Sequence, residues 1–172
     1  MTNYLIDTNV FIEAKNRHYG FDFCPAFWDW LIDQNHTRNI ASIDEVAKEL
    51  HVVDDDLASW ARRQNASFFL PKNEKVVQQA GLVSDWVCNS NNGYKDNAIT
   101  TFLAAADYWL VAHALALECT VVTHEIRVSV NSKKHIKIPN VCDGFNLGCI
   151  NPYEMLRAEG ARFVLGSSEK LA

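Results

Sequence analysis

Four acidic side chains that lie far apart in the sequence could together hold a metal ion. Asp7 directly follows a short apolar run, residues 3–6, and Glu125 lies two residues beyond the apolar run 120–123. Glu49 stands near the end of an expected helix, and Asp107 lies within a long apolar segment. Carboxylates from separate elements that meet in one place give a site of hard oxygen ligands, which suits Mg²⁺ or Mn²⁺ better than zinc.

Asp107 is the most informative of the four acids. On a helix, its neighbours three and four positions away are all apolar: Leu103, Ala104, Leu110 and Val111. An ionised carboxylate on such a face is costly unless it is paired or binds a metal. A lysine, a hydroxyl or a backbone amide could also satisfy it, which would make the residue structural, but no basic residue lies near it in sequence.

Two acids compete for one position of the site. Glu45 and Glu49 lie four residues apart and therefore share one face of the expected helix. Glu45 stands three residues after Ser42, which is the spacing of a capping box. Because Glu49 borders the apolar stripe of the helix, we expect Glu49 to be the ligand and Glu45 to support it, although either residue fits.

These acids can meet only if the chain brings them to one edge of a sheet. Short apolar runs alternate with segments of helical periodicity, which predicts a parallel sheet with helices on both faces. We expect strands at residues 3–6, 40–41, 67–70, 120–123 and 136–138, and helices at 8–12, 27–32, 42–51, 54–64, 74–88, 100–118 and 151–160. In such folds the site lies at the carboxyl ends of the strands, where Asp7 and Glu125 stand.

Composition excludes several classes of protein. The chain has 172 residues, of which 48% are hydrophobic and 22% charged, as in one globular domain. We expect a single domain with its core in residues 1–150 and a C-terminal helix and tail in 151–172. No uncharged run approaches the roughly 20 residues of a bilayer span, and no secretion signal is visible, so we expect a cytoplasmic protein without a membrane segment. The five cysteines form no CxxC pair and are expected to be reduced thiols.

The formal net charge of −5 is unevenly distributed. Residues 44–56 carry six acids and one base, whereas residues 126–139 carry four bases and no acid: Arg127, Lys133, Lys134 and Lys137. Both segments could simply be solvated surface. Alternatively, an acidic site lies beside a basic rim that follows a phosphate backbone.

The ordered set of acids resembles the PIN-domain nucleases. The resemblance runs from residue 3 to about 150, and no single motif in it is specific. It is carried by Asp7-Thr8-Asn9-Val10, Glu49-Leu50, Ala106-Asp107 and Val121-Val122-Thr123-His124-Glu125. A later stretch is similar to a stand-alone bacterial branch: Ile138-Pro139-Asn140-Val141-Cys142, Asn151-Pro152 and Met155-Leu156-Arg157. Many members end the set with Asp, where this chain has Glu125.

The resemblance implies a three-layer α/β/α fold with a short central parallel sheet, and an endoribonuclease that needs Mg²⁺ or Mn²⁺. It implies that the catalytic and metal-binding residues are Asp7, Glu49, Asp107 and Glu125. Around them, Thr8, Asn9, Thr123 and Glu45 would orient the ligands, and the four bases would contact RNA. Such proteins are often toxins, so an antitoxin protein is an expected partner.

Two other functions compete with this one. A PIN-like module could bind RNA or protein without cutting. A phosphatase of the haloacid dehalogenase type would need a second Asp two residues after Asp7, where this chain has Asn9. We also expect the apolar tail around Phe163, Val164 and Leu165 to pair with another chain, which would give a homodimer.

Overall fold

Short apolar segments form the parallel sheet that the alternation predicts. The computed structural model describes residues 2–129 and 131–164, and in these residues the strand order is β3-β2-β1-β4-β5. The strands are β1 (Tyr4–Ile6), β2 (Ile40–Ile43), β3 (Phe69–Leu70), β4 (Thr120–Val122) and β5 (Cys149–Ile150). All neighbouring strands are parallel. The chain builds outward from β1 to β3 and then crosses to β4 on the other side of β1, so the order reverses between β1 and β4.

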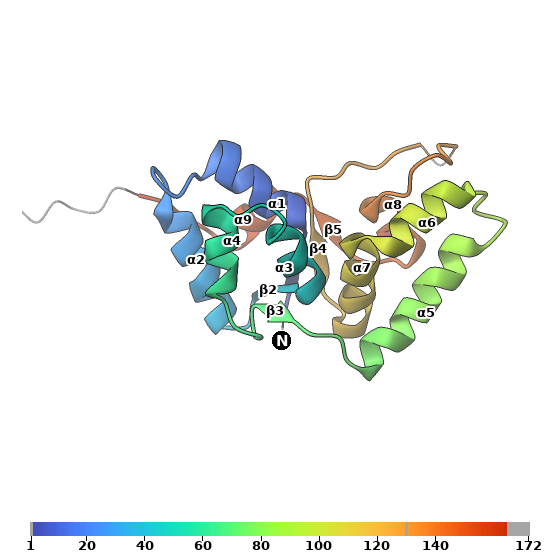
Figure 1. Cartoon of the computed structure of the whole chain (residues 1–172), viewed down its shortest axis with the longest axis horizontal. Helices are drawn as coiled ribbons and strands as arrows, with labels where there is room; N and C mark the ends of the chain where they lie inside the picture. The colour runs from blue at the N-terminus through green and yellow to red at the C-terminus, as the bar shows by residue number, and fades with distance from the viewer. Residues whose placement is uncertain (1, 130, 165–172) are drawn as a thin grey trace, which may run out of the picture.

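Helices cover both faces of this sheet, which confirms the three-layer α/β/α architecture. On one side, α7 (Ala106–Leu117) packs on β1, β2 and β4, and α5 (Glu74–Cys88) packs behind α7. On the other side lie α2 (Pro25–His36), which packs on β2, and α4 (Asp56–Arg62) (Figure 1). The remaining helices are α1 (Thr8–Glu13), the π-helical turn η1 (Ala14–His18), α3 (Asp44–Leu50), α6 (Asp96–Ala104), α8 (Ile138–Gly144) and α9 (Pro152–Ala158).

The single helix expected over residues 100–118 is wrong. Two helices, α6 and α7, meet at an angle of 68°, and Ala105 between them has an extended backbone (φ −88°, ψ 164°). The break places Asp107 in the first turn of α7, where the positive end of the helix dipole stabilises a carboxylate. Within the described residues no single helix is long and apolar enough to cross a bilayer, and α6 and α7 reach that length only as this bent pair.

Two further expectations fail for identifiable reasons. Ser42 does not cap a helix, because it lies in β2 and donates its hydroxyl to the carbonyl oxygen of Ile6 at 2.6 Å. The strand expected at 136–138 is absent from the described residues, since α8 begins at Ile138 and Pro139 occupies its first turn. The two-residue strand β5 was not predicted.

The core is continuous across the sheet, and the C-terminal segment packs onto it. Leu5, Leu110 and Val121 are fully buried in this core. The ring of Phe163 lies 5.7 Å from that of Tyr19, so this residue contacts its own chain and is not a free apolar tail. Val164 is 78% exposed, as expected for this tail, and Leu165 lies outside the described residues. The expected homodimer stays a prediction. All five cysteines are free thiols.

Candidate functional site

The four predicted acids gather at the carboxyl edge of the sheet. Asp7 follows β1 and Glu125 follows β4, the two strands between which the order reverses. This point is where open parallel sheets form a crevice. Asp107 reaches the same edge from the first turn of α7, and Glu49 reaches it from the last turn of α3.

Asp7 is buried, with 3% of its surface exposed. Burial raises the pKa of Asp7, the charges of Asp107 and Glu125 add to this rise, and the net pKa is about 7. Two hydrogen bonds oppose the shift: the hydroxyl of Thr123 donates to Asp7 Oδ2 at 2.7 Å, and the backbone of Thr8 makes a smaller contribution. Asp7 is therefore a buried acid that faces other acids.

Asp107 is half-buried and also faces other acids. Burial and then the negative charges of Glu125 and Glu49 raise its pKa to about 6. The ammonium group of Lys137 lowers the pKa in part. Asp107 and Glu125 raise the pKa of Asp7, and Glu125 and Glu49 raise the pKa of Asp107. The four acids therefore form one electrostatic cluster.

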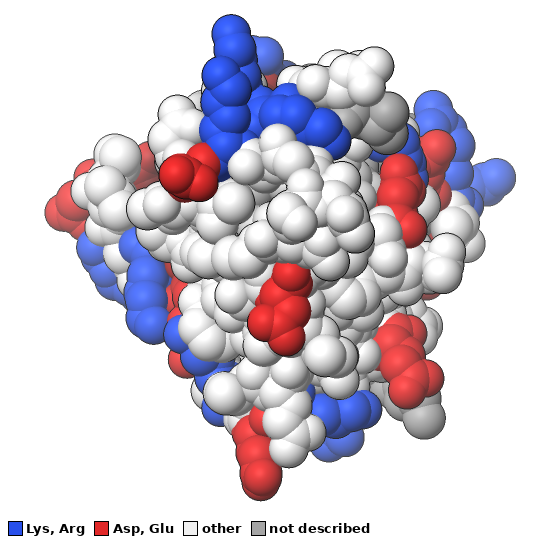
Figure 2. All heavy atoms as spheres, turned by 90° about the vertical axis from the view of Figure 1, so that its right-hand side faces the viewer, with Lys and Arg blue, Asp and Glu red and all other residues white. Residues whose placement is uncertain are grey.

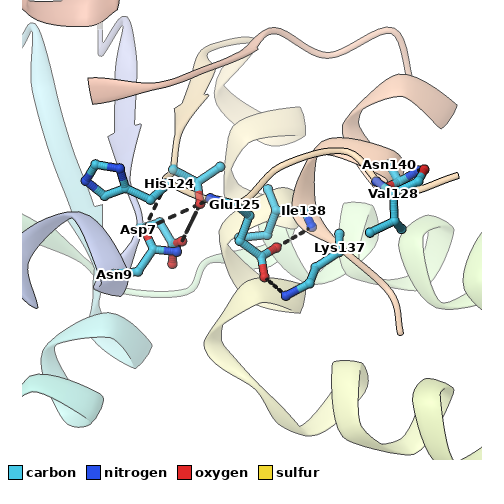
Figure 3. Close-up of polar contacts among 9 residues, drawn as sticks. Asp7, Asn9, His124, Glu125, Val128, Lys137, Ile138 and Asn140 are labelled. Carbon is cyan, nitrogen blue, oxygen red and sulfur yellow. Dashed lines mark hydrogen bonds and ion pairs between the residues drawn. The ribbon is translucent and has the colours of Figure 1, made fainter. Parts of the chain in front are cut away.

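Thr123 and Asn9 tie the ends of β1 and β4 together. The hydroxyl oxygen of Thr123 accepts hydrogen bonds from Asn9 Nδ2 at 3.1 Å and from the Glu125 backbone at 2.9 Å. Asn9 Oδ1 accepts from the His124 backbone at 3.0 Å (Figure 3). With its bond to Asp7, the threonine hydroxyl uses its one donor and both acceptor sites. These contacts hold Asp7 and Glu125 at adjacent strand ends.

Glu49, and not Glu45, belongs to the acid cluster. Glu49 Oε2 accepts from the Thr8 hydroxyl at 2.5 Å, and Oε1 accepts from the Ala106 backbone at 3.3 Å. Glu45 instead forms ion pairs with Lys72 at 2.8 Å and with Lys48 at 3.4 Å. Its supporting role stays a prediction.

Glu125 is held by the end of the loop that it begins. One carboxylate oxygen forms an ion pair with Lys137 Nζ, and the other accepts from the Ile138 backbone at 2.8 Å (Figure 3). Glu125 thereby caps the start of α8. Lys137, expected on a basic rim, lies inside the acid cluster instead.

This arrangement limits how many groups can hold a metal ion. Among the described residues, no three His, Cys, Asp or Glu side chains are placed to hold one. Both oxygens of Glu49 and both of Glu125 already have partners. An oxygen that accepts one hydrogen bond still has a lone pair, so the clearest obstacle is the ion pair of Glu125 with Lys137. Asp7, Glu49 and Asp107 form no ion pair within the described residues. One or two carboxylates with water are how proteins usually bind Mg²⁺, so these residues fit a hydrated divalent ion.

The four bases predicted to contact RNA have different surroundings. Arg127 makes two hydrogen bonds of 2.8 Å to Asp143, and Lys133 Nζ lies 5.3 Å from the centre of the Tyr94 ring. Lys134 is exposed. Figure 2 shows one group of Lys and Arg at the upper border of the face that carries α5 and α6, and further Lys and Arg at its other borders.

Two cavities flank the acid cluster. One, of about 300 Å³, is lined by residues that include Asp107, Glu125, Lys134 and Lys137. The other, of about 530 Å³, shares Glu125 and Lys137 with the first. Its wall also contains His18, His124 and Tyr153. Sequence reasoning missed His18 and Tyr153, because neither lies in a motif or near an acid of the site in sequence.

Comparisons with known proteins place this fold. The chain is similar to the crystal structure of VapBC2 from Rickettsia felis bound to a DNA fragment from their promoter, with a TM-score of 0.54 and 18% identity. It is also similar to the crystal structure of FitAcB from Neisseria gonorrhoeae, with a TM-score of 0.52 and 17% identity. Each match covers 87% of this chain and 98% of the other. The PIN-like fold that the resemblance implies is confirmed.

Sequence comparison gives the family directly. No curated protein matches the chain in sequence. A family model described as a domain of unknown function, DUF4411, matches residues 4–163, which is nearly the whole chain. The protein therefore belongs to the DUF4411 family and has a PIN-like fold.

Proposed function

We propose that this protein is a nuclease that hydrolyses phosphodiester bonds of RNA with the help of a divalent metal ion. One observation carries the proposal: Asp7 and Asp107, from distant parts of the chain, lie in one acid cluster with raised pKa values. Burying like charges together is unfavourable, and a cation bound between them removes that penalty. Such a penalty is typical of functional sites.

In this proposal Asp7 and Asp107 hold Mg²⁺ or Mn²⁺, and Glu49 and Glu125 complete the catalytic group around them. When bound, the ion lowers the pKa of a water molecule and stabilises negative charge on the phosphate. The chain contributes orientation. Thr123 fixes the carboxylate of Asp7, and Thr8 fixes that of Glu49.

Lys137 and Lys134 supply positive charge on the substrate side. Lys137 Nζ lies against Glu125 and lowers the pKa of Asp107, so it is close to both acids. A phosphate at this site would meet the lysine as well as the ion, which offsets the repulsion from the carboxylates. Lys134, on the wall of the cavity that contains Asp107, would contact the RNA backbone further from the scissile bond.

The same resemblance leads us to propose that the nuclease is the toxin of a toxin–antitoxin pair. The likeness to the VapBC2 and FitAcB structures is consistent with this assignment. The partner would be an antitoxin protein, and co-purification from a host that expresses both neighbouring genes tests that assignment.

Cleavage of a labelled single-stranded RNA in Mn²⁺ tests the enzymatic proposal. We expect cleavage by the unmodified protein and none by Asp7→Asn or Asp107→Asn. Asp85→Asn is the matched control, because Asp85 is an exposed acid on α5. Equal cleavage by all four proteins would point to a contaminating nuclease and would refute the proposal.

The ion pair between Lys137 and Glu125 favours a second candidate, a PIN-like module that binds RNA without cutting it. The pair engages one of the four acids with a cation of the chain itself and leaves three for a metal ion. This candidate predicts that the folded protein binds RNA equally well with and without metal and leaves it intact.

A further inference from the structure

Three rings from distant parts of the chain meet beside the acid cluster. His18 ends η1, His124 follows β4, and Tyr153 lies in the first turn of α9. The ring centres of His18 and His124 lie 5.7 Å and 5.9 Å from that of Tyr153, and 6.0 Å from each other. The Tyr153 hydroxyl and His18 Nε2 lie 3.0 Å apart, so each ring is held by the others.

The rings line an open cavity. Its volume of about 530 Å³ falls in the range of ~300–1,000 Å³ that is usual for ligand sites. His18 is exposed, and His124 and Tyr153 are half-buried, so ring surface remains available in the cavity. A cluster whose purpose was only to pack would hide these surfaces.

The cavity wall carries two bases, Arg17 and Lys137, each paired with an acid of the same wall. Glu125 and Lys137 form part of its wall and also line the smaller cavity that contains Asp107, so the rings stand directly beside the acid cluster. Arg17 lies on the same wall, with its side chain 70% exposed and 3.2 Å from Glu13. Figure 3 shows His124 directed away from Lys137, on the other side of Glu125.

We infer that His18, His124 and Tyr153 form a subsite for one unpaired nucleobase of single-stranded RNA, next to the phosphate that is cut. Proteins bind unpaired bases by stacking them on aromatic and histidine rings beside a positively charged track. This inference rests on the proposed function for its location relative to the scissile bond. It adds a requirement that the acid cluster alone does not impose: the substrate must be unpaired at that position.

Binding of a short fluorescein-labelled RNA, followed by fluorescence anisotropy, tests the subsite. All variants carry Asp107→Asn so that the RNA stays intact. We expect Tyr153→Ala and His124→Ala to weaken binding roughly five-fold to a hundred-fold, the range that corresponds to stacking one base at ~1–3 kcal/mol. Tyr153→Phe keeps the ring and loses only the hydroxyl, so its affinity stays within about two-fold.

The matched control is His36→Ala, at the end of α2. His36 is exposed and precedes β2, so it lies at the amino edge of the sheet, opposite the cavity. Its removal leaves binding unchanged. Thermal unfolding of every variant confirms that affinity is compared between folded proteins.

An RNA with one abasic position distinguishes stacking from a structural role of the rings. A series of RNAs carries the abasic position at successive places along the chain. With the intact ring cluster, we expect one RNA of the series to bind more weakly than the others. Tyr153→Ala should not weaken the binding of that RNA further. If Tyr153→Ala weakens binding of the intact and abasic RNAs equally, or if Tyr153→Phe is as weak as Tyr153→Ala, the inference is wrong.

Cleavage by the unmodified protein separates this inference from the proposed function. Ring variants that bind and cut RNA normally would overturn the subsite and leave the nuclease intact. A protein that never cuts RNA but shows the abasic effect would overturn the nuclease and keep the base subsite.

Discussion

Replacing Asp107 with Asn should stabilise the metal-free protein at alkaline pH. The pKa of Asp107 rises from 3.8 to about 6 on folding, first because of burial and then because of Glu125 and Glu49. A shift of about two pH units corresponds to roughly 3 kcal/mol. At pH 8 this carboxyl is ionised in both the folded and the unfolded chain, and only the folded chain is destabilised by it. Near pH 4 it is protonated in the folded chain and about half ionised in the unfolded chain, so its effect falls below about 1 kcal/mol, and it disappears at lower pH.

Urea denaturation in EDTA between pH 4 and pH 8 measures this difference. We expect Asp107→Asn to be more stable than the unmodified protein by up to roughly 3 kcal/mol at pH 8, and within about 1 kcal/mol of it near pH 4. Asp85→Asn is the control and should follow the unmodified protein throughout. Equal stabilities at pH 8, or a less stable Asp107→Asn, would refute the view that Asp107 is destabilised by burial and by neighbouring acids.

Three other measurements examine separate parts of the structure. Millimolar Mn²⁺ should raise the melting temperature of the unmodified protein by an amount that grows with metal concentration. The melting temperature of Asp107→Asn should not change. An equal rise in both proteins would exclude Asp107 as a ligand. Ser42→Ala removes the hydroxyl that donates to the Ile6 carbonyl oxygen and should lower the free energy of unfolding by ~1–3 kcal/mol. A loss below a few tenths of a kcal/mol would mean that water replaces the hydroxyl. Lys134→Glu should flatten the salt dependence of RNA binding, and an unchanged slope would make Lys134 ordinary surface.

Local sequence signals predicted most of the fold. The helix at 74–88 matches α5 at both ends, because the apolar spacing runs through it and Asn73 caps its start by accepting from Val76 N at 3.0 Å. The start of α9 at Pro152 was also predicted, from the Asn-Pro pair. Such signals act within a few residues and are visible in a single sequence.

The errors occur where contacts between distant residues decide the structure. The break between α6 and α7 contains no glycine or proline, and the Ala106 amide that it frees is capped by Glu49, 57 positions away. Ser42 has the local spacing of a capping residue, but its hydroxyl binds a carbonyl 36 positions away. Neither partner can be read from the residues around the error.

The candidate site could also be predicted only in part, for the same reason. Asp7 and Glu125 could be located because they follow strands that end at one edge, and this rule depends only on the order of elements. The ion pair of Glu125 with Lys137 depends on how a loop closes, which the sequence does not display. The contact between His18 and Tyr153 joins residues 135 positions apart, so the ring cluster left no signal either.

Glu125 holds both ends of the loop of residues 126–137. The loop leaves the sheet at this residue and returns to the same carboxylate through Lys137 and Ile138. A cation that binds Glu125, or a phosphate that binds Lys137, would compete with the ion pair between these two residues. The end of the loop and the start of α8 would then lose a contact. We therefore expect a ligand of the acid cluster to change the position of Lys133 and Lys134, which lie on this loop.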